Sequence, residues 1–284
     1  PFCIIGERIN PTNRDKLAES LREGGTGIVQ AEAEKQAAEG AHMIDVNLGV
    51  PGLDEAAAMK RVIPALDSSQ KLPLCLDTTS AEAMEAGLQA AAGKVLINSV
   101  NGSSESLETV LPLAARYGAG VICLAVGEKG IPKTAGARRR VLRTIVEAAE
   151  KAGVPRENLI CDTLTLTVSA QQKRADATMT ALRLVKEELG LPTVLGVSNI
   201  SFGLPRRSLV NATFLAMTMG AGLDAAIMNP GDAGMMDTVR SGSVLTVRDK
   251  DSRAFVSQHI KKRKSGKKKK KKKEVERGGL FDCV

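Results

Sequence analysis

The chain has 284 residues, of which 43% are hydrophobic, 25% charged and 2% aromatic. This composition is typical of a globular protein with a large core, and no apolar run approaches the roughly 20 residues of a membrane helix, so we expect no membrane association. The formal charge of +8 is concentrated in residues 259–284, where 12 Lys and Arg stand against three Asp and Glu, which leaves a net charge of −1 on residues 1–258. The basic balance is therefore no argument for nucleic-acid binding, and we expect none.

Cysteine and histidine usage indicates the compartment. The chain contains no C-x-x-C motif and two histidines, His42 and His259, so we expect no protein-bound metal. The first residues, PFCIIGERIN, lack the features of a signal peptide. We therefore expect a cytoplasmic protein with reduced thiols, most of them buried in strand-like runs: Cys3, Cys75, Cys123, Cys161 and Cys283.

Short apolar runs alternate with longer segments of helical character along the chain. Strands are predicted over residues 2–5, 43–48, 72–77, 95–98, 120–126, 158–163, 193–195 and 225–228. Helices are predicted over residues 13–39 with an interruption at 24–27, from 54, over 80–92, from 103 or 104 to 117, over 138–152, up to 190, over 209–219 and up to about 247.

Eight βα units in about 250 residues predict a parallel sheet closed into a (β/α)8 TIM barrel, as one domain over residues 1–258. A doubly wound open sheet is the alternative, but no G-x-G-x-x-G follows the first strand and no P-loop is present. Residues 259–284 form a separate basic tail, predicted to be a disordered, solvated low-complexity end. The alternative for its lysine run, residues 267–273, is an electrostatic arm for an acidic partner protein or nucleic acid.

Polar side chains stand at or just after the ends of seven of the eight predicted strands. In a barrel these ends meet at one mouth, where the chemistry of this fold is carried out. A single Asp or Asn at such a place is commonly a cap for the next helix, but seven together are harder to explain by capping. The fifth strand has no such residue before Glu128. The others provide Glu7, Asn10, Asp45, Asn47, Asp77, Asn98, Asp162, Asn199 and Asn229.

The chemistry of these side chains favours some classes of ligand over others. No Ser–His or Cys–His pair is available for acyl transfer. A phosphate site needs backbone nests with Lys or Arg, and we expect neither at these strand ends. Carboxylates and amides suit a neutral heterocycle that presents several N–H donors and a carbonyl, such as the aminopyrimidinone edge of a pterin. Charge-assisted hydrogen bonds of about 1.5–3 kcal/mol each would make two aspartates sufficient for oriented binding.

Six motifs in a fixed order resemble one family over residues 4 to about 256. They are GERIN (6–10), DVNLG (45–49), LCLDTT (74–79), LINSVN (96–101), GIPK (130–133) and VLGVSNISFGLP (194–205). The chain resembles the methyltetrahydrofolate:corrinoid methyltransferases. These belong to the pterin-binding barrel superfamily, together with the folate module of cobalamin-dependent methionine synthase and, more distantly, dihydropteroate synthase.

The resemblance implies a role for each matching residue. Asn199 matches the asparagine at the methyl-bearing nitrogen, where its amide would stabilise the transition state by a hydrogen bond rather than act as an acid. Arg207 matches an arginine close to the pterin, with a solvated arginine at a helix start as the alternative. The pterin edge would be held by Asp77, Asn98 and Asp162, next to Gly196, Ser198 and an apolar wall at Ile227. Supporting roles fall to Glu7, Asn10, Asp45 and Asn47.

The same resemblance implies tetrahydrofolate or methyltetrahydrofolate as the substrate and a corrinoid (cobalamin) supplied by a separate corrinoid-binding protein. Neither histidine lies in a D-x-H-x-x-G cobalt-ligand motif. We also expect a homodimer. The direction of methyl transfer stays open, although the SFGLP segment favours transfer from the methylcorrinoid to tetrahydrofolate, as in O-demethylase-type systems. The alternatives are a dihydropteroate synthase-like enzyme and a non-catalytic folate-binding protein.

Overall fold

The computed structural model describes residues 1–172 and 174–258. Its strands are β1 (Cys3–Ile9), β2 (Met43–Val46), β3 (Leu74–Asp77), β4 (Leu96–Gly102), β5 (Gly120–Gly127), β6 (Leu159–Asp162), β7 (Thr193–Gly196) and β8 (Ala225–Met228). Its helices are α1 (Asp15–Arg22), α2 (Gly27–Ala38), α3 (Glu55–Ser69), α4 (Ala81–Ala90), α5 (Ser104–Tyr117), α6 (Ala135–Lys151), α7 (Val168–Gln171), α8 (Arg174–Leu184), α9 (Arg207–Gly220) and α10 (Ala233–Leu245). None of the described helices is long and apolar enough to cross a membrane.

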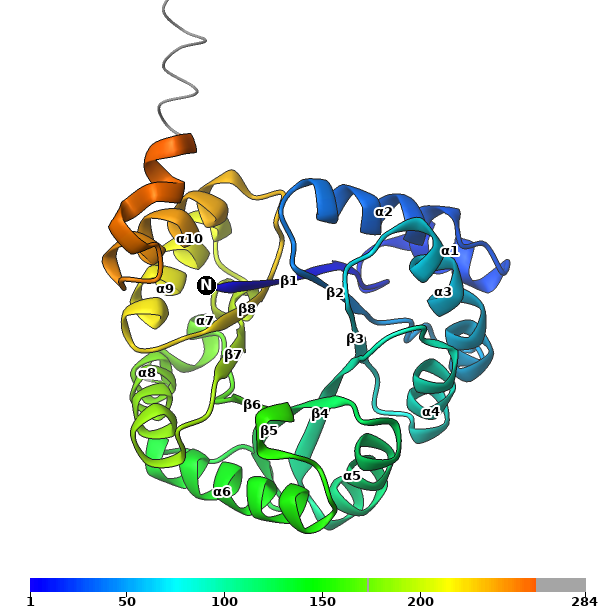
Figure 1. Ribbon diagram of the computed structural model, residues 1–284, viewed down its shortest axis with the longest axis horizontal. Coiled ribbons are helices and arrows are strands. Elements are labelled where there is room, and N and C mark those ends of the chain that lie inside the picture. The colour runs from blue at the N-terminus through cyan, green and yellow to red at the C-terminus, as the bar shows by residue number, and fades with distance from the viewer. Residues whose placement is uncertain (173, 259–284) are drawn as a thin grey trace, which may run out of the picture.

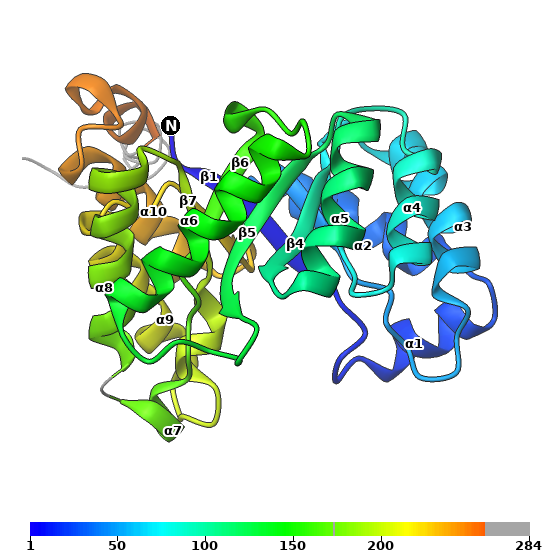
Figure 2. The ribbon, with the colours of Figure 1, turned by 90° about the horizontal axis from the view of Figure 1, so that it is seen from below.

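The strands close into a parallel barrel in sequence order, with helices around it (Figure 1). Closure is made by β1 and β8, where Cys3 pairs with Ala225 and Gly6 with Met228. The predicted (β/α)8 barrel is confirmed. In Figure 2 the short helices α1 and α7 lie beyond the end of the barrel opposite the amino terminus, which is the end where the strands finish. These two helices belong to the connections after β1 and β6, so they flank the mouth.

The barrel interior is filled at its centre by apolar side chains from successive strands. Alternate strands contribute Ile5, Cys75, Ile122 and Val194 to one cluster, against which Met43, Leu96 and Ile160 of the intervening strands pack. This is the layered packing of a barrel with a solid core. A larger apolar shell between the strands and the helices surrounds it. The closed centre means that a ligand enters only from an end.

Local signals account for several element boundaries. Ser80 and Ser103 cap α4 and α5, since their hydroxyl groups accept from the backbone N–H three residues later, at 3.2 Å in both cases. Asp54 caps α3 in the same way. The predicted break at residues 24–27 separates α1 from α2.

Three predicted boundaries were wrong. The first strand continues through Glu7 to Ile9, and the fourth through to Gly102, because these residues still pair with neighbouring strands. The single long helix expected before residue 190 is divided into α7, α8 and a π-helical turn at Val185–Leu189. Of the cysteines, Cys75, Cys123 and Cys161 are buried free thiols as predicted, and Cys3 is half-buried. Cys283, His259 and the basic tail, residues 259–284, lie outside the described residues.

Candidate functional site

The floor of the site follows from strand alternation. Because successive side chains of a strand point to opposite faces, the residue two positions beyond a core side chain again points into the barrel. Two positions beyond the apolar centre lie Glu7, Asp45, Asp77, Asn98 and Asp162. Over these two positions along the strands, the barrel lining therefore changes from apolar to acidic. On β5, β7 and β8 the corresponding positions are Leu124, Gly196 and Ile227.

These side chains open into a single pocket of about 650 Å³ at the carboxyl end of the barrel. Every predicted site residue except Asn47 lines it: Glu7, Asn10, Asp45, Asp77, Asn98, Asp162, Gly196, Ser198, Asn199, Arg207 and Ile227. Residues that the sequence reasoning did not select line it as well: Arg8, Thr12, Asn13, Arg14, Leu124, Leu164, Thr165 and Phe202. The structure thus brings the predicted residues together in one pocket.

The acidic floor is ordered by amide donors. Asn98 Nδ2 donates to Asp45 Oδ1 at 3.2 Å, and Asn47 Nδ2 donates to Asp77 Oδ2 at 3.0 Å. Asn47 therefore orients Asp77 without lining the pocket itself. The Cys75 thiol is a further hydrogen-bond partner of Asp45. Asp77 keeps its Oδ1 without a hydrogen bond to a described residue, and this oxygen is one that a ligand could use.

Burial disfavours the charges that this floor would carry. Burial, and then the nearby Asp77 carboxylate, raise the pKa of Asp45 to about 7. Burial also raises the pKa of Asp162 to about 7, although the Leu164 N–H and the positive charge of Arg138 oppose this. The pKa values of Asp77 and Glu7 are raised for the same reason. A ligand with N–H donors would favour the ionised carboxylates and so offset this cost.

The loop after β6 is held by a fully buried arginine. Arg138 of α6 donates from Nη1 to the carbonyl oxygens of Thr163 and Leu164 at 2.8 and 2.9 Å, and from Nε to Pro132 O at 3.3 Å. Leu164 has a φ of 68°, which is unfavourable for a branched side chain, and its N–H donates to Asp162 Oδ1 at 2.6 Å. Arg138 therefore stabilises the strained backbone that positions Asp162.

The end of β7 presents the amide of Asn199. The 3-10 turn Val197–Ser201 follows directly on Gly196. A Cβ at Gly196 would lie 3.2 Å from Nδ2 of Asn199, so glycine leaves room for the amide over the pocket. Asn199 is exposed, and its side chain makes no hydrogen bond to any described residue. Its amide is therefore free to bind a ligand.

Arg207 supports this turn. Its Nη2 donates to Ser198 O at 2.9 Å and its Nε to Ser201 Oγ at 3.1 Å. Its guanidinium also lies 5.6 Å from the centre of the Phe202 ring. Ser198 in turn donates to Glu7 Oε1 at 2.8 Å, which connects the ends of β7 and β1 across the barrel closure. Arg207 is also exposed and is the first residue of α9, so the alternative of a solvated arginine at a helix start stands beside the pterin role, with the guanidinium hydrogen-bonded to the turn.

Two other strand-end predictions need correction. Basic side chains were not expected at the strand ends apart from Arg207, but Arg8 and Arg14 line the pocket beside β1. Asn229 does not line the pocket, and its side chain instead accepts from Gly231 N in the following turn at 3.0 Å, while Asp232 caps α10. Glu128 likewise accepts from Ser104 N at the start of α5. Arg8 was visible within the GERIN motif, whereas nothing in the sequence singled out Arg14 or Thr165.

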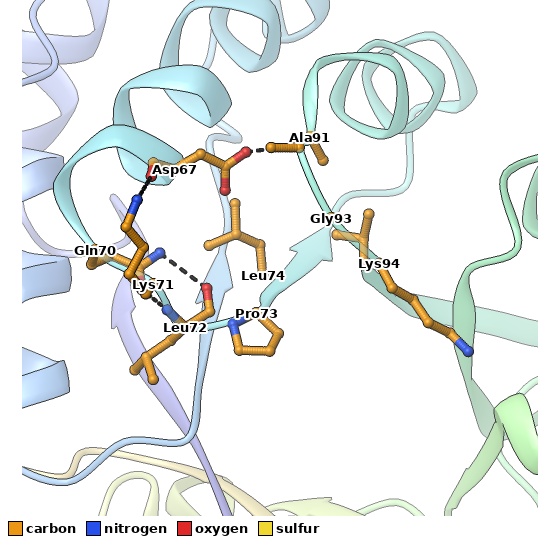
Figure 3. A pocket seen from close by; sticks show the side chains of 11 residues that line it. Asp67, Gln70, Lys71, Leu72, Pro73, Leu74, Ala91, Gly93 and Lys94 are labelled. Carbon is orange, nitrogen blue, oxygen red and sulfur yellow. Dashed lines mark hydrogen bonds between the residues drawn. The ribbon is translucent and has the colours of Figure 1, made fainter.

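A second pocket, of about 390 Å³, lies at the opposite end of the barrel, where β3 and β4 begin (Figure 3). Its polar groups are occupied by local contacts. Asp67 accepts from Ala92 N at 2.8 Å, and Gln70 Nε2 donates to Leu72 O at 3.1 Å. Polar contacts at this end of a barrel usually serve stability. Within residues 1–172 and 174–258, no three His, Cys, Asp or Glu side chains are arranged to hold a metal ion.

The model of one protein family, described as pterin binding enzyme, matches residues 6–229. The chain belongs to the pterin-binding enzyme family. The matched range runs from the beginning of the GERIN motif to the end of β8 and contains every predicted site residue. The acidic and amide-rich floor described above thus lies within the part of the chain that matches the family.

Two kinds of relative are similar to this pterin-binding barrel. A methionine synthase of Mycobacterium tuberculosis is 34% identical over 239 residues, which are 80% of this chain and 20% of that protein. A methylcorrinoid:tetrahydrofolate methyltransferase of Eubacterium limosum is 26% identical over 259 residues, which are 89% of this chain and 94% of that protein. The chain thus spans about a fifth of the methionine synthase. Both relatives are enzymes by name, and the second is matched over nearly its whole length.

Solved structures of dihydropteroate synthase from Xanthomonas albilineans share the fold. The structure with 4-aminobenzoic acid aligns with a TM-score of 0.65 and 19% identity, covering 88% of this chain and 93% of that one. The structure with 7,8-dihydropteroate aligns with a TM-score of 0.61 and 20% identity. At this identity the likeness shows the barrel architecture alone.

Proposed function

We propose that this protein is a methyltransferase that moves a methyl group between tetrahydrofolate and the cobalt of a corrinoid carried by a separate protein. The observation that carries the proposal is the position of the free Asn199 amide over a floor of Asp77, Asn98 and Asp162 in one pocket. The near-complete coverage of the Eubacterium limosum methyltransferase supports it over a dihydropteroate synthase reaction.

The floor residues would bind the pterin by its hydrogen-bonding edge. An ionised carboxylate accepts N–H bonds from an aminopyrimidinone, and Asn98 both donates and accepts. Because Asn98 already donates to Asp45, its amide oxygen is the group available to the ligand. Ile227 and Leu124 provide apolar contacts for the ring faces. The substrate would thus be held with its reactive nitrogen toward the mouth.

Asn199 would act on that nitrogen. A methyl group leaves a tetrahydrofolate nitrogen only if the nitrogen is protonated or hydrogen-bonded while the bond breaks, since an amide anion is a poor leaving group. Asn199 has no proton to give at neutral pH, but the hydrogen bond that its N–H donates strengthens as the folate nitrogen gains charge, and this lowers the barrier. The proton would arrive through water or from the aspartates, two of which have a pKa of about 7.

A bound corrinoid would supply a cobalt atom that accepts or releases the methyl group. We place it on a separate protein and favour transfer from the methylcorrinoid to tetrahydrofolate. The SFGLP segment and the name of the relative matched over 94% of its length support this direction. Methionine synthase relatives match more closely in sequence over a fifth of their length, so both directions are to be measured.

The test combines binding and turnover. Titration calorimetry with tetrahydrofolate and methyltetrahydrofolate compares the wild type with Asp77→Asn and Asn199→Ala. We expect Asp77→Asn to weaken binding about tenfold to a hundredfold, through loss of a charge-assisted hydrogen bond. Asn199→Ala should bind both folates within about threefold of the wild type, but it should transfer methyl to cob(I)alamin, or from methylcobalamin, about a hundredfold more slowly. A wild type that binds neither folate would refute the proposal, and folate binding without any turnover would leave a folate-binding protein.

A further inference from the structure

The mechanism above leaves the basic side of the pocket unused. Arg8 lies near the end of β1 and Arg14 just before α1, and both line the same pocket as the acidic floor. Their side chains are 41% and 25% exposed. The pocket is therefore acidic at its floor and positively charged at this part of its rim.

The two arginines share one carboxylate. Arg14 Nη2 contacts Glu32 Oε2 at 2.6 Å, and Arg14 also donates to the Arg8 carbonyl oxygen. Arg8 Nε lies 3.8 Å from Glu32 Oε1, which is beyond hydrogen-bond distance. The Arg8 guanidinium makes no hydrogen bond to any described residue, and the group of three carries a net charge of +1. The Arg14 guanidinium is thus used in contacts with Glu32 and the Arg8 carbonyl oxygen, whereas the N–H groups of the Arg8 guanidinium remain available to a ligand.

On the β7 side of the mouth, the third arginine of the pocket has its donors in use. The Arg207 guanidinium is already bound to the turn at Ser198 and Ser201. The floor carboxylates repel an anionic group, so the end of a ligand that carries negative charge is favoured outside the floor. Among the arginines of this pocket, Arg8 is the one with both exposure and free donors to receive it. A guanidinium pairs with a carboxylate through two parallel N–H bonds.

We propose that Arg8, kept in place by the Arg14–Glu32 pair, binds a carboxylate of the glutamyl tail of the folate substrate. This inference rests on the proposed function and deepens it, because it assigns the second end of the same ligand. A tetrahydrofolate has a neutral pterin at one end and glutamyl carboxylates at the other, which matches an acidic floor and a basic rim. The rim thereby selects folates over pterins that lack a tail, and fixes the orientation with the tail outward.

The test separates the two ends of the ligand. Calorimetry with tetrahydrofolate, its triglutamate form and tail-less 6-methyltetrahydropterin compares the wild type, Arg8→Gln and Arg22→Gln. Arg22 is an exposed arginine of neighbouring α1 that does not line the pocket, and it serves as the matched control. We expect Arg8→Gln to weaken both folates about fivefold to tenfold and to leave the tail-less pterin unchanged, since a partly exposed charge pair contributes modestly. High salt should weaken wild-type folate binding toward the Arg8→Gln value.

Each contrary outcome has a distinct meaning. If Arg8→Gln binds the folates as the wild type does, or weakens all three ligands equally, the inference is overturned while the proposed function stands. If Arg8→Gln loses affinity for inorganic pyrophosphate but not for the folates, the rim is a phosphate site and the inference is again overturned. A wild type that binds none of the three pterin ligands would remove the proposed function itself.

Discussion

Asp162→Asn tests the electrostatic description of the floor. Burial raises the pKa of this carboxyl from 3.8 to about 7, so between about pH 4 and 7 the folded protein holds a proton that the unfolded chain releases. The free energy of unfolding therefore falls as the pH rises through this window, and the full penalty is present above pH 7. A shift of about three units corresponds to about 4 kcal/mol as an upper value, and about 2 kcal/mol after relaxation of the site.

Asparagine is a matched change because its Oδ1 still accepts from Leu164 N and it never ionises. We expect Asp162→Asn to raise the free energy of unfolding by about 2 kcal/mol at pH 8 and by much less at pH 5. Urea denaturation of the ligand-free protein at both pH values measures this. Asp237→Asn on the exposed face of α10 is the control, with a 67% exposed side chain and no expected effect.

The same variant has an opposite effect on the ligand. Pterin N–H groups need an ionised acceptor, so folate affinity should fall about tenfold to a hundredfold at pH 8. Wild-type affinity should also fall as the pH drops below about 7, while that of Asp162→Asn changes less. An Asp162→Asn protein that keeps the pH dependence of the wild type in both stability and affinity would refute the reasoning.

Further substitutions probe the groups around the floor. Gly196→Ala places a Cβ 3.2 Å from Nδ2 of Asn199, so methyl transfer should slow about tenfold or more with an unchanged melting temperature; a wild-type rate would contradict this. Thr165 is buried with no partner for Oγ1 among the described residues, so Thr165→Val should leave the free energy of unfolding unchanged or raise it by about 1 kcal/mol, whereas a clear loss would show a hidden partner. Arg138→Met should lower the free energy of unfolding by about 3 kcal/mol or more, because buried carbonyl groups lose their hydrogen-bond donor. As the control, Arg140→Met at an exposed position of the same helix should change the free energy of unfolding by less than about 0.5 kcal/mol.

Much of the fold was predictable because the local periodicity of apolar residues indicates each strand and helix. Short apolar runs alternate with amphipathic segments, and each βα unit can be recognised by itself. The extended ends of β1 and β4 were missed, since their last residues are polar and pair with neighbours that only the closed barrel supplies. The division before residue 190 was missed because a helical pattern over such a stretch does not show where it breaks.

The carboxylates and amides of the floor could be found from the sequence by their place at strand ends, since every parallel strand of a barrel ends at the same mouth. The hydrogen bonds that these side chains make with one another could not be found from the sequence. That Asn47 donates to Asp77 while Asp45 accepts from Asn98 is decided by contacts between the ends of separate strands. The position of the Asn199 amide depends on the 3-10 turn that contains it, which Arg207 holds at Ser198.

Short segments of the chain were enough to predict the repeated βα unit, the polar strand ends and the resemblance to a pterin-binding barrel, because each is a property of a few neighbouring residues. The folded chain was needed to show that Arg8 and Arg14 share Glu32 of α2 at the rim, and that Arg138 of α6 stabilises the loop after β6. Those contacts join elements far apart in the chain, and no local pattern records which charge remains free once the barrel has closed.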